Sequence, residues 1–146
     1  MSEIEASIDR VIEAYRASVA ARDIDAFMHL YDPTARVFDA WGVWSYETVP
    51  AWRVAVEGWF VSHPADRFSV VFEDVRSVST PAFASVSAIV TYAVHSARGE
   101  QLNAMQNRLT WVLKTSGHVP RIIHEHTSAP VGFDDQKAIL QRASKP

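Results

Sequence analysis

The chain has 146 residues, which suits one domain, and 48% hydrophobic with 21% charged residues is ordinary for a globular protein. The formal net charge is −3 and the basic residues are scattered, so we expect no nucleic-acid partner. Cysteine is absent, which excludes disulfides and thiolate chemistry. The N-terminus lacks the pattern of a leader peptide, and no apolar run approaches the roughly 18 residues of a membrane span. We therefore expect a cytoplasmic protein without a membrane partner.

The N-terminal part of the chain has the periodicity of amphipathic helices. Ser2 and Glu5 have capping-box spacing, and apolar residues then recur on one face, which predicts a helix over about residues 3–21. The members of this face are Ile4, Ile8, Val11, Ile12, Tyr15 and Val19. Asp23 is a favourable N-cap for a second helix, which Asp32-Pro33 would close. Its predicted apolar face is Ile24, Phe27, Met28 and Tyr31.

A short apolar strand over residues 35–39 is predicted next, and it ends at Asp39. Gly42 then turns the chain. A third helix is predicted to start near residues 48–50, where Pro50 is tolerated in the first turn. Its apolar positions include Trp52, Val56, Trp59 and Phe60.

From residue 67 onward the period of the hydrophobic pattern becomes two, which is typical of strands. Four antiparallel strands are predicted, separated by turn residues; they lie at about residues 67–78, 82–95, 101–114 and 119–128. A short helix from Asp134 or Asp135 through Arg142, or a tail over about residues 134–146, ends the chain. Helices first and a meander afterwards indicate an α+β fold in which a curved sheet wraps over the helices.

The order of the elements and several residues resemble the nuclear transport factor 2-like superfamily, and within it the SnoaL-like and ketosteroid-isomerase-like proteins. Residues 23–31 and 35–39 look like the second helix and first strand of that group. Residues 108–111 and 123–130 are similar to the closing hairpin of the calcium/calmodulin-dependent kinase II association domain. The resemblance implies one domain over 1–146 with a core at about 3–130, built as a cone-shaped, cystatin-like antiparallel sheet. It also implies a hydrophobic small-molecule ligand and a homodimer that pairs through the open sheet.

Asp39 and Tyr15 are the candidate catalytic residues. By the resemblance, Tyr15 falls where ketosteroid isomerases have their oxyanion-hole tyrosine and Asp39 where they have the proton-shuttling base. Their protonated aspartate has no match, and Asn107 is the nearest candidate. Strand alternation also groups Asp39 with Val37 and turns it inward, where nearby tryptophans create an apolar site that raises a carboxylate's pKa. The alternatives are that Asp39 caps the turn and that Tyr15 packs in the core.

The candidate ligand-binding residues come from two regions. The five tryptophan and phenylalanine residues between positions 41 and 60 predict a cavity lid, although such residues at helical spacing are also common in cores. They are Trp41, Trp44, Trp52, Trp59 and Phe60. On the last two predicted strands, the alternation of side chains assigns each residue to one of two faces, but it does not say which face lines the pocket. The association-domain resemblance favours Leu109, Glu125 and Thr127 on the concave side.

The same resemblance places Arg108, His124 and His126 on the convex side or at a subunit interface. A His-x-His pair can chelate a metal, but a metal site needs at least a third ligand, and no partner motif is present. An arginine and two histidines on one face more typically form a polar network. We therefore expect neither a metal nor another cofactor.

Two classes of function remain. The first is an enzyme acting on a hydrophobic carbonyl compound, in which Asp39 removes a proton while Tyr15 and Asn107 stabilise the enolate. The second is a non-catalytic ligand-binding or oligomerisation module, because this fold hosts both. Since the third isomerase residue is unmatched, a small-molecule pocket protein ranks first, with isomerase-like proton transfer as its most concrete form.

Overall fold

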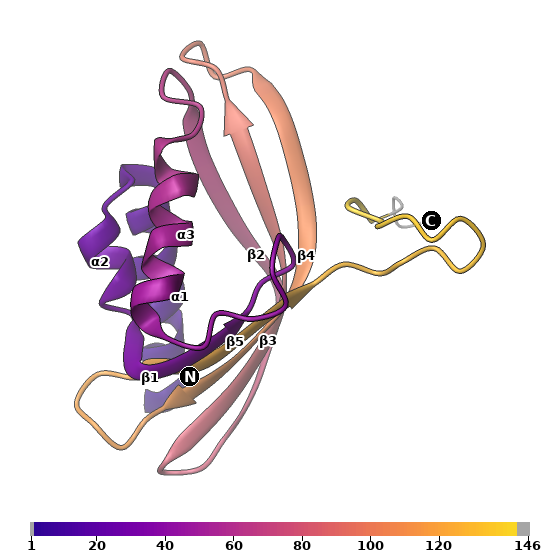
Figure 1. Ribbon diagram of the computed structural model, residues 1–146. Helices are drawn as coiled ribbons and strands as arrows, with labels where there is room; N and C mark the ends of the chain where they lie inside the picture. The colour runs from indigo at the N-terminus through magenta and orange to yellow at the C-terminus, as the bar shows by residue number, and fades with distance from the viewer. Residues whose placement is uncertain (1, 143–146) are drawn as a thin grey trace.

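The computed structural model describes residues 2–142 as helices packed on one face of a five-stranded, curved and unclosed sheet (Figure 1). The helices are α1 (Glu3–Ala21), α2 (Ile24–Met28) and α3 (Val49–Val61). The strands are β1 (Tyr31–Phe38), β2 (Arg67–Ser79), β3 (Phe83–His95), β4 (Gln101–Lys114) and β5 (Arg121–Ser128). The α+β class expected from the sequence is confirmed. No helix within residues 2–142 is long and apolar enough to cross a membrane.

The first helix forms where the sequence predicts it. Its capping box is complete, because Ser2 Oγ accepts from the Glu5 N–H and Glu5 Oε2 accepts from the Ser2 N–H, both at 3.2 Å. One face of α1 is buried, and its members include Ile8, Val11, Tyr15 and Val19. The helix ends at Arg22, which adopts a left-handed conformation with φ 53°.

The Arg22 side chain ties the end of α1 to the loop that follows α3. Its guanidinium donates to the carbonyl oxygens of Phe60, Ser62, His63 and Asp66 at 2.9, 3.0, 2.7 and 2.5 Å. Five N–H donors in a rigid fork allow one arginine to satisfy several carbonyl groups at a helix end and in a loop. The loop after α3 is thereby held against α1.

The second helix is shorter than predicted, because Tyr31 belongs to β1 and not to the face of α2. The Ile122 N–H donates to the Leu30 carbonyl at 2.9 Å, and Tyr31 pairs with Ile122, so sheet pairing overrides the helical spacing. Pro33 lies within β1, which is tolerated because β1 is an edge strand and its register shifts between Tyr31 and Arg36.

The strand order is β1-β5-β4-β3-β2, in which β5 to β2 are antiparallel neighbours and β1 runs parallel to β5. The register sets Glu125 of β5 between Val37 of β1 and Trp111 of β4. Next to this row, Asn107 of β4 pairs with Val90 of β3. The sheet therefore gathers polar side chains from distant parts of the sequence on its buried face.

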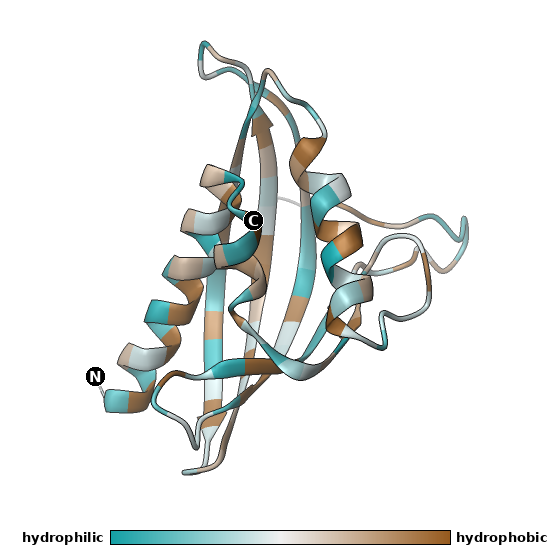
Figure 2. Cartoon of the chain, turned by 60° about the vertical axis from the view of Figure 1, so that its left-hand side comes forward, coloured by the Kyte–Doolittle hydropathy of each residue, from teal (hydrophilic) through white to brown (hydrophobic). Residues whose placement is uncertain are grey.

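Aromatic residues fill the space between the helices and the sheet. Phe27 of α2 lies at the centre, with ring-centroid distances of 5.0 Å to Tyr15, 5.5 Å to Tyr31, 5.4 Å to Phe60 and 6.0 Å to Trp59. Figure 2 shows apolar and polar residues alternating along the strands and both kinds on each long helix, as amphipathic elements around a core require. This cluster fixes the helices that carry the site.

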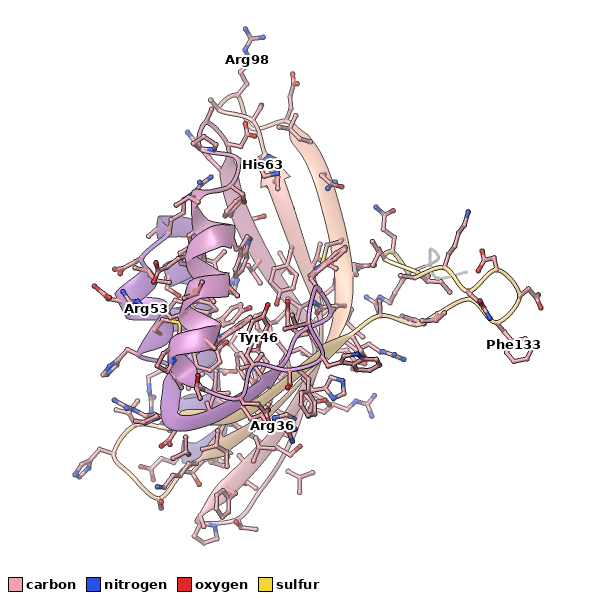
Figure 3. All side chains as sticks on the ribbon, viewed as in Figure 1. Arg36, Tyr46, Arg53, His63, Arg98 and Phe133 are labelled. Carbon is pink, nitrogen blue, oxygen red and sulfur yellow. The ribbon has the colours of Figure 1, made fainter. Side chains whose placement is uncertain are left out.

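The segment after β5 leaves the domain as an arm, and the helix predicted to run through Arg142 is not formed. Residues 129–142 form a turn and extended stretches, and Gln136 has φ 57°, which ends the helical turn after one hydrogen bond to Gly132. Phe133 lies at the tip of the arm, away from the helices (Figure 3). The last residues of the predicted helix or tail, 143–146, lie outside the described part of the chain.

Candidate functional site

A cavity of about 550 Å³ lies between the helices and the sheet. Most of its wall is apolar and comes from α3 and from β2 to β4; among the apolar lining residues are Trp52, Val56, Trp59, Phe68, Val94 and Met105. Tyr46 and His63, which also line it, lie beside opposite ends of α3 (Figure 3). Such a volume is within the range of about 300–1,000 Å³ typical of small-molecule sites.

The cavity brings together residues that the sequence nominated from five different segments. The nominated residues that line it are Tyr15, Asp39, Trp41, Trp52, Trp59, Asn107 and Glu125. Four others do not line it, and one of them, Leu109, is buried in the core. Trp44 is 98% exposed in the loop after β1, Phe60 is buried against Phe27 and Trp59, and Thr127 is buried behind Asp39. A helical or loop position alone could not separate these orientations.

Asp39 follows β1 directly and combines both roles considered for it. The Thr127 hydroxyl donates to Asp39 Oδ1 at 3.1 Å while accepting the Ala40 N–H at 2.9 Å, and the Trp41 N–H donates to Oδ2 at 3.4 Å. The carboxylate thus caps the turn and also faces the cavity. Burial raises the pKa of Asp39, and the hydrogen bonds from Thr127 and the backbone oppose this rise.

Tyr15 pairs with Tyr92, a residue that the sequence did not single out. Their hydroxyl oxygens are 2.9 Å apart, and both side chains line the cavity. Burial raises the pKa of both hydroxyls, so both remain protonated at neutral pH. One hydroxyl donates to the other, and the proton of the accepting hydroxyl is left for a third group. No motif marks Tyr92, because only the folding of β3 over α1 brings it to Tyr15.

Glu125 is the most buried carboxyl group of the site, with 1% of its surface exposed. Its Oε1 atom accepts from the Tyr31 hydroxyl at 2.7 Å and from the Trp111 indole N–H at 2.9 Å. Burial raises the pKa of Glu125 to about 7, the two hydrogen bonds oppose this rise, and the charge of Asp39 adds to it.

Two buried polar atoms on residues of the cavity wall have no hydrogen-bond partner within residues 2–142. They are the Trp52 indole nitrogen and the Asn107 Oδ1 atom. The large majority of buried polar atoms in proteins have a hydrogen-bond partner. At these two positions the described residues provide none, so a ligand could supply the partner.

The burial of side chains shows which face of β4 and β5 is turned toward the helices. Leu109, Glu125 and Thr127 are buried, as the association-domain resemblance implied, and Asn107 is buried with them, whereas Arg108 and His126 are exposed on the opposite face. Arg108 donates to Ser128 Oγ at 3.1 Å.

The two histidines share an aromatic neighbour. Phe38 stacks edge-on against His124 and His126 at 5.0 and 5.5 Å, and His124 Nδ1 donates to the Arg36 carbonyl at 2.8 Å. Within the described residues, no group of three or more His, Cys, Asp or Glu side chains is placed to hold a metal ion.

Glu125 gives the free energy of unfolding a predictable dependence on pH. Between pH 4.5 and about pH 7, the folded chain keeps a proton on Glu125 that the unfolded chain has lost. The resulting stabilisation is fully present below pH 4.5 and disappears as the pH rises through about 7. A pKa shift of this size corresponds to about 3 kcal/mol.

When the pH is raised from 4.5 to 8, the free energy of unfolding of the wild type should therefore fall by about 3 kcal/mol relative to that of Glu125→Gln, which cannot titrate at this position. Urea unfolding of both proteins at each pH measures this difference. Glu100→Gln, at an exposed position, is the matched control and should follow the wild type. Parallel pH profiles for the wild type and Glu125→Gln would contradict the raised pKa.

The chain was compared with known proteins. The profile of the SnoaL-like domain matches residues 8–132. A search of the curated proteins gives no match. The fold is similar to that of an NTF2-like protein of unknown function from Pseudomonas putida KT2440, with a TM-score of 0.83, 20% identity, and 97% and 96% of the two chains covered.

Two further solved structures are similar. One is assigned to the calcium/calmodulin-dependent protein kinase II association domain of Xanthomonas campestris (TM-score 0.67, 16% identity, 84% and 85% covered). The other is Aln2 from a Streptomyces species (TM-score 0.77, 13% identity, 88% and 91% covered). Identities this low show the fold alone, whereas the profile match spans most of the chain. The chain therefore belongs to the SnoaL-like domain family and has the nuclear transport factor 2-like fold that its sequence resembles.

Proposed function

We propose that the protein binds a hydrophobic carbonyl compound in the cavity and that Asp39 transfers a proton at the carbon next to the carbonyl group. The observation that carries this proposal is a carboxylate of raised pKa on the wall of a largely apolar cavity that also contains a protonated tyrosine pair. A base with a pKa closer to neutrality both accepts and returns a proton efficiently.

The proposed reaction uses only groups of this chain. Asp39 takes a proton from the α-carbon, and the electron pair of the broken C–H bond moves to the carbonyl oxygen, which becomes an enolate. The free proton of the Tyr15–Tyr92 pair donates a hydrogen bond to that oxygen. Protonated Asp39 then returns the proton to the same carbon or to another carbon of the conjugated system, so no further reactant is needed.

The remaining wall residues supply binding and orientation. Trp41 and Trp59 offer aromatic surface, and burial of aromatic surface is the main source of affinity for a hydrophobic ligand. Phe60 and Thr127 act indirectly, because Phe60 packs against Trp59 at 5.1 Å and Thr127 holds Asp39. Trp44 is exposed and has no role in this proposal.

The second candidate is a non-catalytic ligand-binding or oligomerisation module. The similarity to a structure assigned to a kinase association domain supports this candidate, since the same fold is also found in a protein that is named for association and not for catalysis. The enzyme and the ligand-binding module share the cavity and differ only in whether a C–H bond is broken, whereas an oligomerisation module needs no ligand.

Proton exchange separates the two candidates. A panel of bicyclic and tricyclic aryl ketones would be incubated with the wild-type protein in deuterated water, and the α-proton signals followed by NMR, with binding measured by calorimetry. Proton transfer predicts loss of the α-proton signal at a rate well above the buffer background for the ketones that bind. Ketones that bind without exchange would contradict proton transfer and leave the binding module standing.

We further propose that the chain forms a homodimer through the convex face of the sheet. This face exposes apolar side chains of the edge strand β2, with Val71 at 44% and Val78 at 77%, and farther across the sheet it carries the exposed Arg108 on β4 and His126 on β5. Light scattering should give twice the chain mass of 16.3 kDa at micromolar concentration, and Arg108→Glu should weaken assembly. A monomeric wild-type protein would contradict this proposal.

A further inference from the structure

Asp39 is not the only carboxyl group of the cavity, because Glu125 also lines it and has no part in the proposed proton abstraction. We infer that Glu125 is the second acid–base group of the site and that its Oε2–H donates a hydrogen bond to an oxygen of the bound ligand. The inference rests on the proposed function only in taking the ligand to be an apolar molecule that carries an oxygen acceptor.

The hydrogen bonds of Glu125 decide where its proton lies. Both donors, the Tyr31 hydroxyl and the Trp111 indole N–H, reach the same oxygen, Oε1. Oε1 is therefore the carbonyl oxygen of the neutral acid, and the proton is on Oε2. Both of these hydrogen bonds are made at Oε1 and the side chain lines the cavity, so Oε2 is the oxygen left for the ligand. An acid held in this way presents its O–H to the ligand.

The surroundings of Glu125 keep it neutral at physiological pH. The titratable groups that act on it are the hydroxyls of Tyr31, Tyr15 and Tyr92, from β1, α1 and β3, and the carboxylate of Asp39. The residues that line the cavity include no Lys or Arg, and His63 is the one histidine among them. Burial and the charge of Asp39 raise the pKa of Glu125 to about 7. Asp39, which is less buried, loses its proton first as the pH rises.

The two carboxyl groups thus differ in their protonation state over a range of pH below about 7. Groups whose environments push their pKa values apart are suited to separate acid and base tasks. Asp39 can accept a proton from carbon while Glu125 donates to oxygen. Above about pH 7, Glu125 loses its O–H proton and becomes an anion. It can then no longer donate a hydrogen bond to the ligand, and its negative charge repels the lone pairs of the ligand oxygen.

The ligand preference that follows is for a neutral oxygen acceptor, bound more tightly at pH 5.5 than at pH 8.5. The probe is 2-acetylnaphthalene, which accepts a hydrogen bond but does not donate one. 2-Isopropylnaphthalene is its matched control, because it has a similar shape and no acceptor. Calorimetry should show wild-type affinity for the ketone about tenfold higher at pH 5.5 than at pH 8.5, as loss of one hydrogen bond to a buried group implies. Affinity for the hydrocarbon should not depend on pH.

Glu125→Gln makes the test specific to this residue. Its amide oxygen can accept from Tyr31 and Trp111, and its amide N–H replaces the O–H toward the ligand. Ketone affinity of Glu125→Gln should therefore stay near the low-pH value of the wild type at every pH. The pH dependence should persist in Asp39→Asn.

Each outcome separates the two proposals. A wild-type ketone affinity that does not change with pH, or a change that survives in Glu125→Gln, would overturn the role of Glu125. If the ketone binds with the expected pH dependence but its α-protons do not exchange, the role of Glu125 stands and the proposed proton transfer fails. If the α-protons exchange while binding is independent of pH, the proton transfer stands and the role of Glu125 fails.

Discussion

Asp39→Asn should lower the rate of α-proton exchange by about 10³-fold, the usual contribution of a general base. The asparagine side chain keeps the shape of Asp39, and its single amide oxygen can still accept the shorter hydrogen bond, from Thr127, but it cannot take a proton from carbon. Affinity for the ketone should therefore change little. NMR exchange rates and calorimetry on the same ketone measure the two quantities separately.

Asp9→Asn is the matched control for this substitution, since Asp9 is an exposed carboxylate on α1. Its exchange rate should equal that of the wild type. If Asp39→Asn exchanges α-protons as fast as the wild type does, another group is the base and the assignment of Asp39 is wrong.

Phe27→Ala should lower the free energy of unfolding by about 3–5 kcal/mol, the range for removing a buried phenylalanine. Phe27 is fully buried, and its ring contacts Tyr15, Tyr31, Phe60 and Trp59. Removing it leaves a cavity among four aromatic rings that cannot all move to fill it. Urea unfolding followed by tryptophan fluorescence measures the change.

Phe27→Leu retains most of the side-chain volume and should lose markedly less stability than Phe27→Ala. At a temperature where Phe27→Ala remains folded, its ketone affinity should also fall, because Tyr15 packs on Phe27 at a centroid distance of 5.0 Å. A loss below about 1 kcal/mol for Phe27→Ala would contradict the central place of this ring in the core.

Local patterns in the sequence predict most of the fold. The Ser2 capping box, the helix start expected near residues 48–50 and the change of period at residue 67 lie at element boundaries that the structure has. These signals are short-range, so they do not depend on which other segments are neighbours. Tyr31 and the segment before Arg142 are the exceptions. Pairing with β5 places Tyr31 in a strand and not in a helix, and the left-handed backbone of Gln136 interrupts the helix expected before Arg142.

The candidate site is less predictable, because its contacts join residues far apart in the chain. The sequence nominated Tyr15, Asp39 and Glu125, but strand parity could not say that Glu125 faces the helices. Tyr92 shows no signal of its own, since its link to Tyr15 spans two packed layers. Nor does any local pattern distinguish the exposed Trp44 from Trp41 at the cavity wall.

The titration of the Asp39 carboxyl group tests the central claim most directly, because it requires no substrate. The ¹³Cγ signal of Asp39, assigned by its absence from the spectrum of Asp39→Asn, would be followed by NMR between pH 2 and pH 8. A base buried at the wall of an apolar cavity should titrate above the ordinary aspartate pKa of about 3.9, because burial disfavours the anion. An Asp39 pKa at or below that value would contradict a proton-transferring role for this residue.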